Sequence, residues 1–379
     1  MDIAAIHASN HPLVIAVTGG GSEAIARLLT IPGASRTVLE AIVPYSSQAL
    51  ADFLGRAPEQ YCSSRTARAM AMVAFLRARQ LADPTTPVDR LLGIGCTAAL
   101  ATDRPKAGPH RAHLALQSAA ATYVVDLDLA KGLRSRAEEE SLLADLLLQE
   151  IARACGAAEV VEREERLPGD KLGRQTSAAK PDWRALLLGE VDAVAEGIGR
   201  PAPSGQALTY PVLFPGAFNP LHEGHRQMAA TAAKIAGSPV EFEISLTNVD
   251  KPPLDYMEIE SRLAQFGPDD RVWLTRAPTF VEKAALFPGA TFVVGADTIV
   301  RIADPKYCGG DSARVELAID QLAASSARFL VFGRLVKGRF ESLADLSLPV
   351  RLTALCTEIP PSEFRLDISS TELRRQADE

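Results

Sequence analysis

Two histidines three positions apart, His222 and His225, stand between a short apolar run and a helical pattern. The run YPVLF (210–214) predicts a β-strand, and the stretch HRQMAATAAKIAG that starts at His225 predicts a helix. Two imidazoles in the first turn of a helix face the same side. Free backbone N–H groups and the helix dipole attract anions there. The spacing therefore predicts a site that holds a polyphosphate at the start of this helix.

The segment between strand and helix is expected to form one wall of that site. A glycine at 216 would let the backbone pass close to a ligand, and the pair Asn219-Pro220 is typical of a turn. The residues that we expect to contact a nucleotide in this segment are Gly216, Ala217, Phe218, Asn219 and Gly224.

Four motifs in this part of the chain occur in the order found in a known enzyme family. They are HEGH (222–225), NVDKPPLDYMEIESRLAQF (248–266), FVVGADT (292–298) and ISSTELR (368–374). The chain resembles the nucleotidyltransferase superfamily with the H-x-G-H signature, specifically the nicotinamide/nicotinate mononucleotide adenylyltransferases. The resemblance implies that AMP passes from ATP to a phosphorylated acceptor, that pyrophosphate leaves, and that Mg²⁺ is held through the nucleotide phosphates. It also implies a role in NAD biosynthesis.

The resemblance assigns roles to individual residues. His222, His225 and Arg374 would be the catalytic groups. Gly295 and Asp297 would contact the nucleotide at the carboxyl end of a strand, where open α/β sheets bind ligands. The residues that would hold ATP phosphates beside the Arg374 guanidinium are Ile368, Ser369, Ser370 and Thr371. The two residues that would border the acceptor are Lys251 and Arg262.

One departure from the family leaves the acceptor open. The stretch GADTIVRIADPKYCGG (295–310) lacks the tryptophan that often follows the Asp motif and stacks near the pyridine ring. Trp273 stands on another predicted strand and could be a core residue, while Tyr307 or Phe280 could stack instead. Two alternatives therefore stay beside a pyridine mononucleotide acceptor. One is another acceptor such as phosphopantetheine, and the other is a nucleotide-binding sensor or scaffold without turnover.

The first part of the chain resembles a different domain, the nicotinamide-nucleotide amidase found at the C-terminus of CinA proteins. Its TGG, PGAS and YS motifs correspond to those of that family. Ala16 stands where the family has its nucleophilic serine, Ile15 where it has a glutamate, and Leu50 where it has a lysine. Because acyl transfer needs a nucleophile and a group that activates it, we expect an inactive, pseudo-amidase domain. It would serve folding, oligomerisation or nucleotide binding.

Three further polar residues of the first part could take part in chemistry. Ser22 could replace the missing nucleophile, but its place at a predicted helix start is typical of an N-cap. His110 and His113 flank a predicted strand and are interpreted as surface or core residues. A bifunctional protein with both adenylyltransferase and amidase activity is therefore disfavoured.

Strands that alternate with amphipathic helices predict two α/β domains, the second a doubly wound parallel sheet of Rossmann-like type. We place the amidase-like domain at 1–156, a linker with one helix at 157–206 and the nucleotidyltransferase domain at 207–379. The polar stretch VEREERLPGDKLGRQTSAAKP is expected to be a loop within the linker.

Composition limits the partners. The net charge is −7, from 47 acidic and 40 basic residues, and there is no long basic run, which disfavours nucleic acid. No apolar run approaches the roughly 20 residues of a membrane helix, so we expect a cytoplasmic protein without membrane contact. The five cysteines form no C-x-x-C pair, which predicts reduced thiols without zinc or disulfides. The expected partners are ATP and a phosphorylated small molecule, with a homodimer by analogy.

Overall fold

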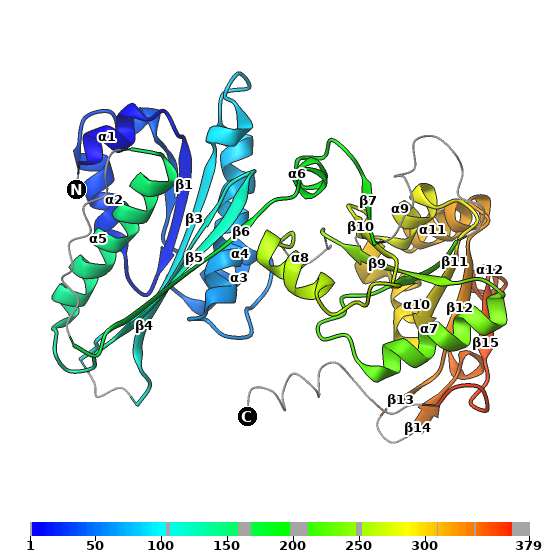
Figure 1. The fold of residues 1–379 in the computed structure, drawn as a ribbon. Coiled ribbons are helices and arrows are strands. Elements are labelled where there is room, and N and C mark those ends of the chain that lie inside the picture. The colour runs from blue at the N-terminus through cyan, green and yellow to red at the C-terminus, as the bar shows by residue number, and fades with distance from the viewer. Residues whose placement is uncertain are drawn as a thin grey trace. The chain divides into compact units, whose positions relative to one another are not determined.

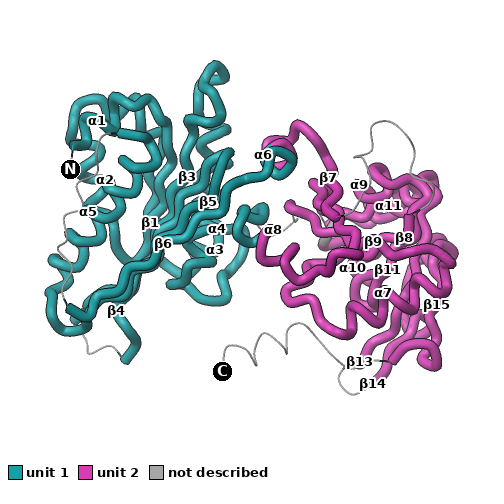
Figure 2. The backbone as a smooth tube through the Cα atoms, viewed as in Figure 1, with its two compact units in different colours: residues 1–184, 250–258 teal, residues 185–249, 259–379 magenta. Residues whose placement is uncertain are grey.

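The chain folds into two compact units in the computed structural model, coloured separately in Figure 2. The residues that the structure describes are 2–103, 107–157, 168–197, 211–247, 252–308, 310–336 and 339–365. Unit 1 comprises Met1–Arg184 and Asp250–Glu258, and unit 2 comprises Ala185–Val249 and Ile259–Glu379. Each unit has its own sheet covered by helices, which confirms the prediction of two α/β domains.

Unit 1 contains a mixed six-stranded sheet in the order β2-β1-β3-β4-β5-β6 (Figure 1). Its strands are β1 (Leu13–Thr18), β2 (Val38–Ile42), β3 (Leu92–Ala99), β4 (His110–Gln117), β5 (Ala121–Leu129) and β6 (Lys171–Ala178). Its principal helices are α1 (Ile3–Ala8), α2 (Ser22–Thr30), α3 (Ser47–Leu54), α4 (Ser64–Leu81) and α5 (Arg136–Ala154). Strand β1 runs parallel to β2 and β3, and the remaining pairs are antiparallel.

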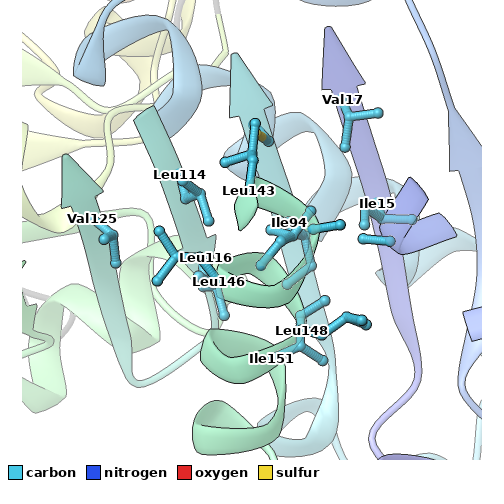
Figure 3. Packing of buried hydrophobic residues seen from close by; sticks show 14 of the residues in the cluster. Ile15, Val17, Ile94, Leu114, Leu116, Val125, Leu143, Leu146, Leu148 and Ile151 are labelled. Carbon is cyan, nitrogen blue, oxygen red and sulfur yellow. The ribbon is translucent and has the colours of Figure 1, made fainter. Parts of the chain in front are cut away.

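Side chains alternate between the two faces of this sheet, as the pleat of a β-strand requires. Figure 3 shows the face covered by α5, where Ile15 and Ile94 of the strands pack with Leu143 of the helix. The opposite face lies against α4. A Cβ at Gly93 would lie 2.1 Å from a backbone nitrogen of that helix, and one at Gly95 would lie 2.2 Å from a backbone oxygen. Glycine at both positions therefore allows the helix to approach the sheet this closely.

The segment expected to be a linker with one helix contains more regular structure. Within its described part, β6 pairs with β5 along its whole length, and α6 (Pro181–Leu188) follows. Strand β7 (Ala193–Glu196) then joins the sheet of unit 2. Residues of β6 were expected to form a loop but form an edge strand of the sheet. Most side chains of this edge strand are exposed, so the sequence shows no apolar alternation that would mark a strand.

Unit 2 contains a seven-stranded sheet in the order β15-β12-β11-β8-β9-β10-β7. Its other strands are β8 (Val212–Pro215), β9 (Val240–Ser245), β10 (Val272–Thr275), β11 (Thr291–Gly295), β12 (Arg328–Phe332) and β15 (Cys356–Ile359). All are parallel except β7, which pairs antiparallel with β10. From β8 the chain adds β9 and β10 on one side of the sheet, and it then returns to add β11, β12 and β15 on the other side. This confirms the predicted doubly wound, Rossmann-like sheet.

Helices connect the parallel strands of unit 2. They are α7 (Glu223–Ala236), α8 (Tyr256–Leu263), α9 (Phe280–Leu286), α10 (Ala296–Ile302), α11 (Ser312–Ala324) and α12 (Val350–Thr353). A short hairpin of β13 (Arg334–Val336) and β14 (Arg339–Glu341) follows β12. Throughout the described ranges, no helix combines the length and apolarity needed to cross a bilayer.

Candidate functional site

A cavity of about 360 Å³ in unit 2 lies where the strand order reverses. It is lined by the ends of β8, β11 and β12, by the first turns of α7 and α10, and by Phe364. This is the position at which doubly wound sheets bind ligands, because the helices on either side of the reversal leave opposite faces and open a crevice. The cavity brings together six of the predicted site residues, which are Gly216, His222, Gly224, His225, Gly295 and Asp297.

The two histidines occupy the start of α7. His222 is the N-cap residue, with extended backbone, and His225 belongs to the first helical turn. Their rings stack with centroids 3.7 Å apart. The backbone N–H of His222 donates to Nδ1 of His225 at 3.2 Å. A neutral His225 that accepts at Nδ1 carries its proton on Nε2 and can donate from there.

Burial makes both imidazoles weak bases. It lowers the pKa of His225 to about 4, with a further contribution from the charge of His222, and burial also lowers the pKa of His222. Both rings are therefore neutral at neutral pH in the unliganded site. They can act as hydrogen-bond donors to phosphate oxygens, and a bound anion would favour their protonated forms.

Phe218 explains the glycine at 216. Its backbone has a positive φ of 43°, and its side chain is 1% exposed. The rings that surround it belong to Phe214, His225, Phe242 and Phe266. A Cβ at residue 216 would lie 2.6 Å from Cζ of Phe218. The absence of a side chain at Gly216 thus makes room for this ring, and the Phe218 side chain belongs to an aromatic cluster.

Two residues at and beyond the end of α8 hold the loop that leads into α7. The Arg262 guanidinium donates to the carbonyl oxygen of Ala217 at 3.0 Å and is 8% exposed. The Gln265 amide donates to the carbonyl of Phe218 at 3.0 Å and accepts from the N–H of Leu221 at 2.8 Å. Arg262, expected to border the acceptor, therefore supports the loop backbone, and an acceptor contact stays a prediction. Gln265 was missed because a single glutamine beyond a predicted helix carries no distinctive sequence signal.

Asp297 lies between two arginines that also line the cavity. Its carboxylate is 3.0 Å from Nη1 of Arg334 and 3.7 Å from Nη2 of Arg301. Both guanidinium groups are substantially exposed, so they are accessible to an anionic ligand. The sequence interpretation missed both arginines. The available signal for Arg334 was its place at the carboxyl end of the strand RFLVFG.

The aromatic residues considered for the pyridine ring have other positions. Trp273 is a core residue, as the sequence suggests, and its indole N–H donates to Glu241 at 2.6 Å. Phe280 packs against Phe292 and Phe329 within the sheet core. The side chain of Tyr307 lies outside the described part of the structure.

Some predicted residues fall outside the described part of the chain. They are Lys251, Ile368, Ser369, Ser370, Thr371 and Arg374. Their roles stay predictions. Among the residues that the structure does describe, no three His, Cys, Asp or Glu side chains gather as a protein metal site requires.

In unit 1, the two positions at which the amidase resemblance would place catalytic residues are apolar and belong to one cluster. Ala16 of β1 and Leu50 of α3 belong to one buried cluster with Leu54 and Met70. Serine and lysine at these two positions would lie near one another, as a catalytic pair must. Alanine and leucine there provide packing only.

The glycine-rich turn of unit 1 binds a carboxylate of its own chain. Glu140 accepts from the N–H groups of Gly21 and Glu23 at 2.9 and 3.1 Å and from the Ser22 hydroxyl at 3.0 Å. The N-cap of α2 is Gly21, and Ser22 is its first helical residue, which corrects the expected N-cap. The positive end of α2 is thus already paired with an anion.

Comparison with known proteins found similar proteins for each part of the chain. Residues 213–376 match the model of a family described as Cytidylyltransferase-like. No curated protein matches the chain. Over its N-terminal part the chain is similar to the competence/damage inducible protein CihA from Agrobacterium tumefaciens, with 22% identity and a TM-score of 0.32. That comparison covers 40% of this chain and 89% of the other.

A second solved structure is a competence-damaged protein (CinA) superfamily protein from Escherichia coli, with 18% identity and a TM-score of 0.29. The comparison covers 39% of this chain and 81% of that one. The C-terminal part, which matches the cytidylyltransferase-like family, is a nucleotidyltransferase domain.

Proposed function

We propose that unit 2 transfers AMP from ATP to the phosphate of nicotinamide or nicotinate mononucleotide and releases pyrophosphate, as a step of NAD biosynthesis. The observation that carries this proposal is the pairing of His222 and His225 at the start of α7, in the cavity that Arg301 and Arg334 also line. The acceptor phosphate is already an anion, so the reaction needs no strong general base. Catalysis then consists of positioning and of stabilising charge on the phosphates.

The residues of the cavity suit that task. His225 presents a donor at Nε2 because its Nδ1 is engaged, and the helix dipole favours negative charge at the same place. The arginine side chains of the cavity add positive charge for the triphosphate. Asp297 offers a carboxylate, a ligand type that Mg²⁺ accepts, and the nucleotide phosphates would supply the other oxygens.

A panel of substrates tests the proposal with the full-length protein. ATP and CTP are each offered with nicotinamide mononucleotide, nicotinate mononucleotide or phosphopantetheine, and pyrophosphate release is followed. We expect turnover with ATP and a pyridine mononucleotide. Preference for CTP or for phosphopantetheine would contradict the substrate assignment. Absence of pyrophosphate release with every pair would favour a sensor or scaffold.

His222→Ala tests the site itself. The substitution removes one ring but keeps the backbone N–H that orients His225. Loss of a donor to developing charge typically lowers kcat by about 100- to 1,000-fold. Gln227→Ala, an exposed position on the same helix, is the matched control and should retain full activity. A near-normal rate in His222→Ala would refute the assignment.

A further inference from the structure

A second cluster of side chains that could take part in catalysis lies in unit 1, on the face of the sheet covered by α4. His113 of β4 and Asp126 of β5 are direct register partners, so their side chains share one face. The His113 Nδ1 is 2.6 Å from a carboxylate oxygen of Asp126. The imidazole is 15% exposed, and the carboxylate is 37% exposed. This is the geometry in which a carboxylate orients a catalytic histidine.

A thiol lies beside this pair. Cys62 stands two residues before the start of α4, and its Sγ is 3.8 Å from the carbonyl oxygen of Thr97, the register partner of His113 on β3. The same sulfur is 3.9 Å from the carbonyl oxygen of Arg111, two residues before His113. The chain thus brings together a nucleophile, a base and a carboxylate from three separate segments.

The imidazole is held in its charged form by these neighbours. Burial alone would lower the pKa of His113, but the hydrogen bond with Asp126, the nearby Cys62 thiol and the charges of both groups raise it to about 9. Nδ1 is engaged by Asp126. Within the part of the chain that the structure describes, Nε2 of His113 is buried and has no hydrogen-bond partner. Nε2 is therefore the nitrogen left to exchange a proton with the thiol or with a leaving group.

Cys62 differs from the other cysteines for which the structure describes the side chain. Burial raises the pKa of Cys155 and of Cys356 to about 11, and it raises the pKa of Cys96 further. Cys62 is partly exposed and adjoins the positive end of α4, an 18-residue helix. A helix N-terminus and a neighbouring imidazolium are the two features that stabilise a reactive thiolate.

We propose that Cys62, His113 and Asp126 form a thiol-dependent acyl-transfer site for esters or amides. The Cys62 sulfur attacks the carbonyl carbon and forms a thioester, while the bond to the alcohol or amine breaks. His113 gives its proton to that leaving group. It then takes a proton from water, whose oxygen attacks the thioester and releases a carboxylic acid and the Cys62 thiolate, so that the thiolate and the imidazolium are both restored. Asp126 is a positioning residue, because it holds the ring through Nδ1.

This site is independent of the serine position that the amidase resemblance points to. Ala16 of β1 pairs with Gly95 of β3, and Thr97 lies two residues further along the same strand. The proposed thiol site therefore lies on the same sheet face as the vacant serine position. His113, interpreted from the sequence as a surface or core residue, becomes the base of this site. The proposal does not depend on the activity of unit 2.

Alkylation of the full-length protein tests the thiol. Iodoacetamide is added at neutral pH, and modification of each cysteine is followed by peptide mass spectrometry. We expect Cys62 to react at least about tenfold faster than Cys356, because Cys62 adjoins a helix N-terminus and lies near the His113 imidazole, whereas burial raises the pKa of Cys356 to about 11. His113→Asn should abolish most of that difference, while His110→Asn, which breaks a neighbouring pair with Glu139, should retain it. Equal rates at Cys62 in the wild type and His113→Asn would overturn the proposal.

Acyl transfer itself is tested with p-nitrophenyl acetate. We expect a burst of p-nitrophenolate and one acetyl group on the Cys62 peptide. Both should be lost in Cys62→Ala and retained in Cys356→Ala. Asp126→Asn should slow the burst and Asp126→Glu should restore part of it, at an unchanged melting temperature. The far-UV circular dichroism spectrum and the melting temperature of each variant show that unit 1 is folded. Acetylation elsewhere, or an unchanged burst in Cys62→Ala, would refute the site.

Discussion

Gly216→Ala distinguishes two explanations for the glycine that follows β8. The sequence suggests that it lets a ligand approach the backbone, whereas the structure fills that space with the Phe218 ring, 2.6 Å from the position of a new Cβ. The ring is 1% exposed, so it cannot move aside freely. Overpacking of this kind costs about 1–3 kcal/mol. For a domain of this size that corresponds to a fall in melting temperature of about 2–12 °C.

Activity should fall as well, because the displaced ring contacts His225 with a centroid distance of 5.1 Å. A shift of about 1 Å in a catalytic group can lower kcat by about 100-fold. The assay combines thermal unfolding with pyrophosphate release at saturating nucleotide. Gly267→Ala is the matched control, since its Cβ would meet Asp270 at an ordinary 3.6 Å.

A double variant decides the cause. If the clash is with Phe218, Gly216→Ala combined with Phe218→Leu should be more stable than the sum of the two single effects predicts. An unchanged melting temperature in Gly216→Ala, together with a raised KM for the nucleotide that Phe218→Leu does not relieve, would refute the packing explanation. It would restore the ligand-approach explanation.

Two other substitutions probe buried groups of unit 2. The pKa of His225 falls from its ordinary 6.5 to about 4 on folding, so the unfolded chain binds this proton first and stability drops as the pH falls from about 6.5 to about 4. The loss of melting temperature from pH 7 to pH 5 should therefore be smaller in His225→Gln, and an equal loss would contradict this. Lys283→Met leaves the Glu243 carboxylate, 1% exposed, without its partner at 2.8 Å, and should cost about 3–5 kcal/mol in chemical denaturation. Lys234→Met, at a 78% exposed side chain, should change stability by less than about 0.5 kcal/mol.

Long amphipathic helices and buried strands of this protein could be predicted from sequence because their signals are local. The helices α4 and α5 and the strand β11 follow directly from periodic apolar residues. Strand β6 could not be found in this way, since a mostly exposed edge strand needs no apolar side chains. Its pairing with β5 depends on backbone hydrogen bonds, which are the same for every sequence.

The residues of the candidate site in unit 2 also divide into those predictable from local sequence and those that are not. The H-x-x-H spacing and the glycine at the end of β11 place His222, His225 and Asp297 by short-range rules, and the structure brings all three to one cavity. Arg334 comes to Asp297 only because β11 and β12 are neighbours in the sheet. No local pattern indicates such a contact.

The sequence by itself determined which residue types were available, among them the paired histidines of unit 2 and the apolar side chains of Ala16 and Leu50 in unit 1. It also predicted the alternation of strands and helices in each unit. The tertiary structure decided which of them meet. It gave Gly216 its packing role, it paired His113 with Asp126, and it brought the Cys62 sulfur to the strand backbone near His113. The physical reason is range. Helix and strand periodicity acts over a few residues, whereas strand register and helix docking join segments that lie tens of residues apart.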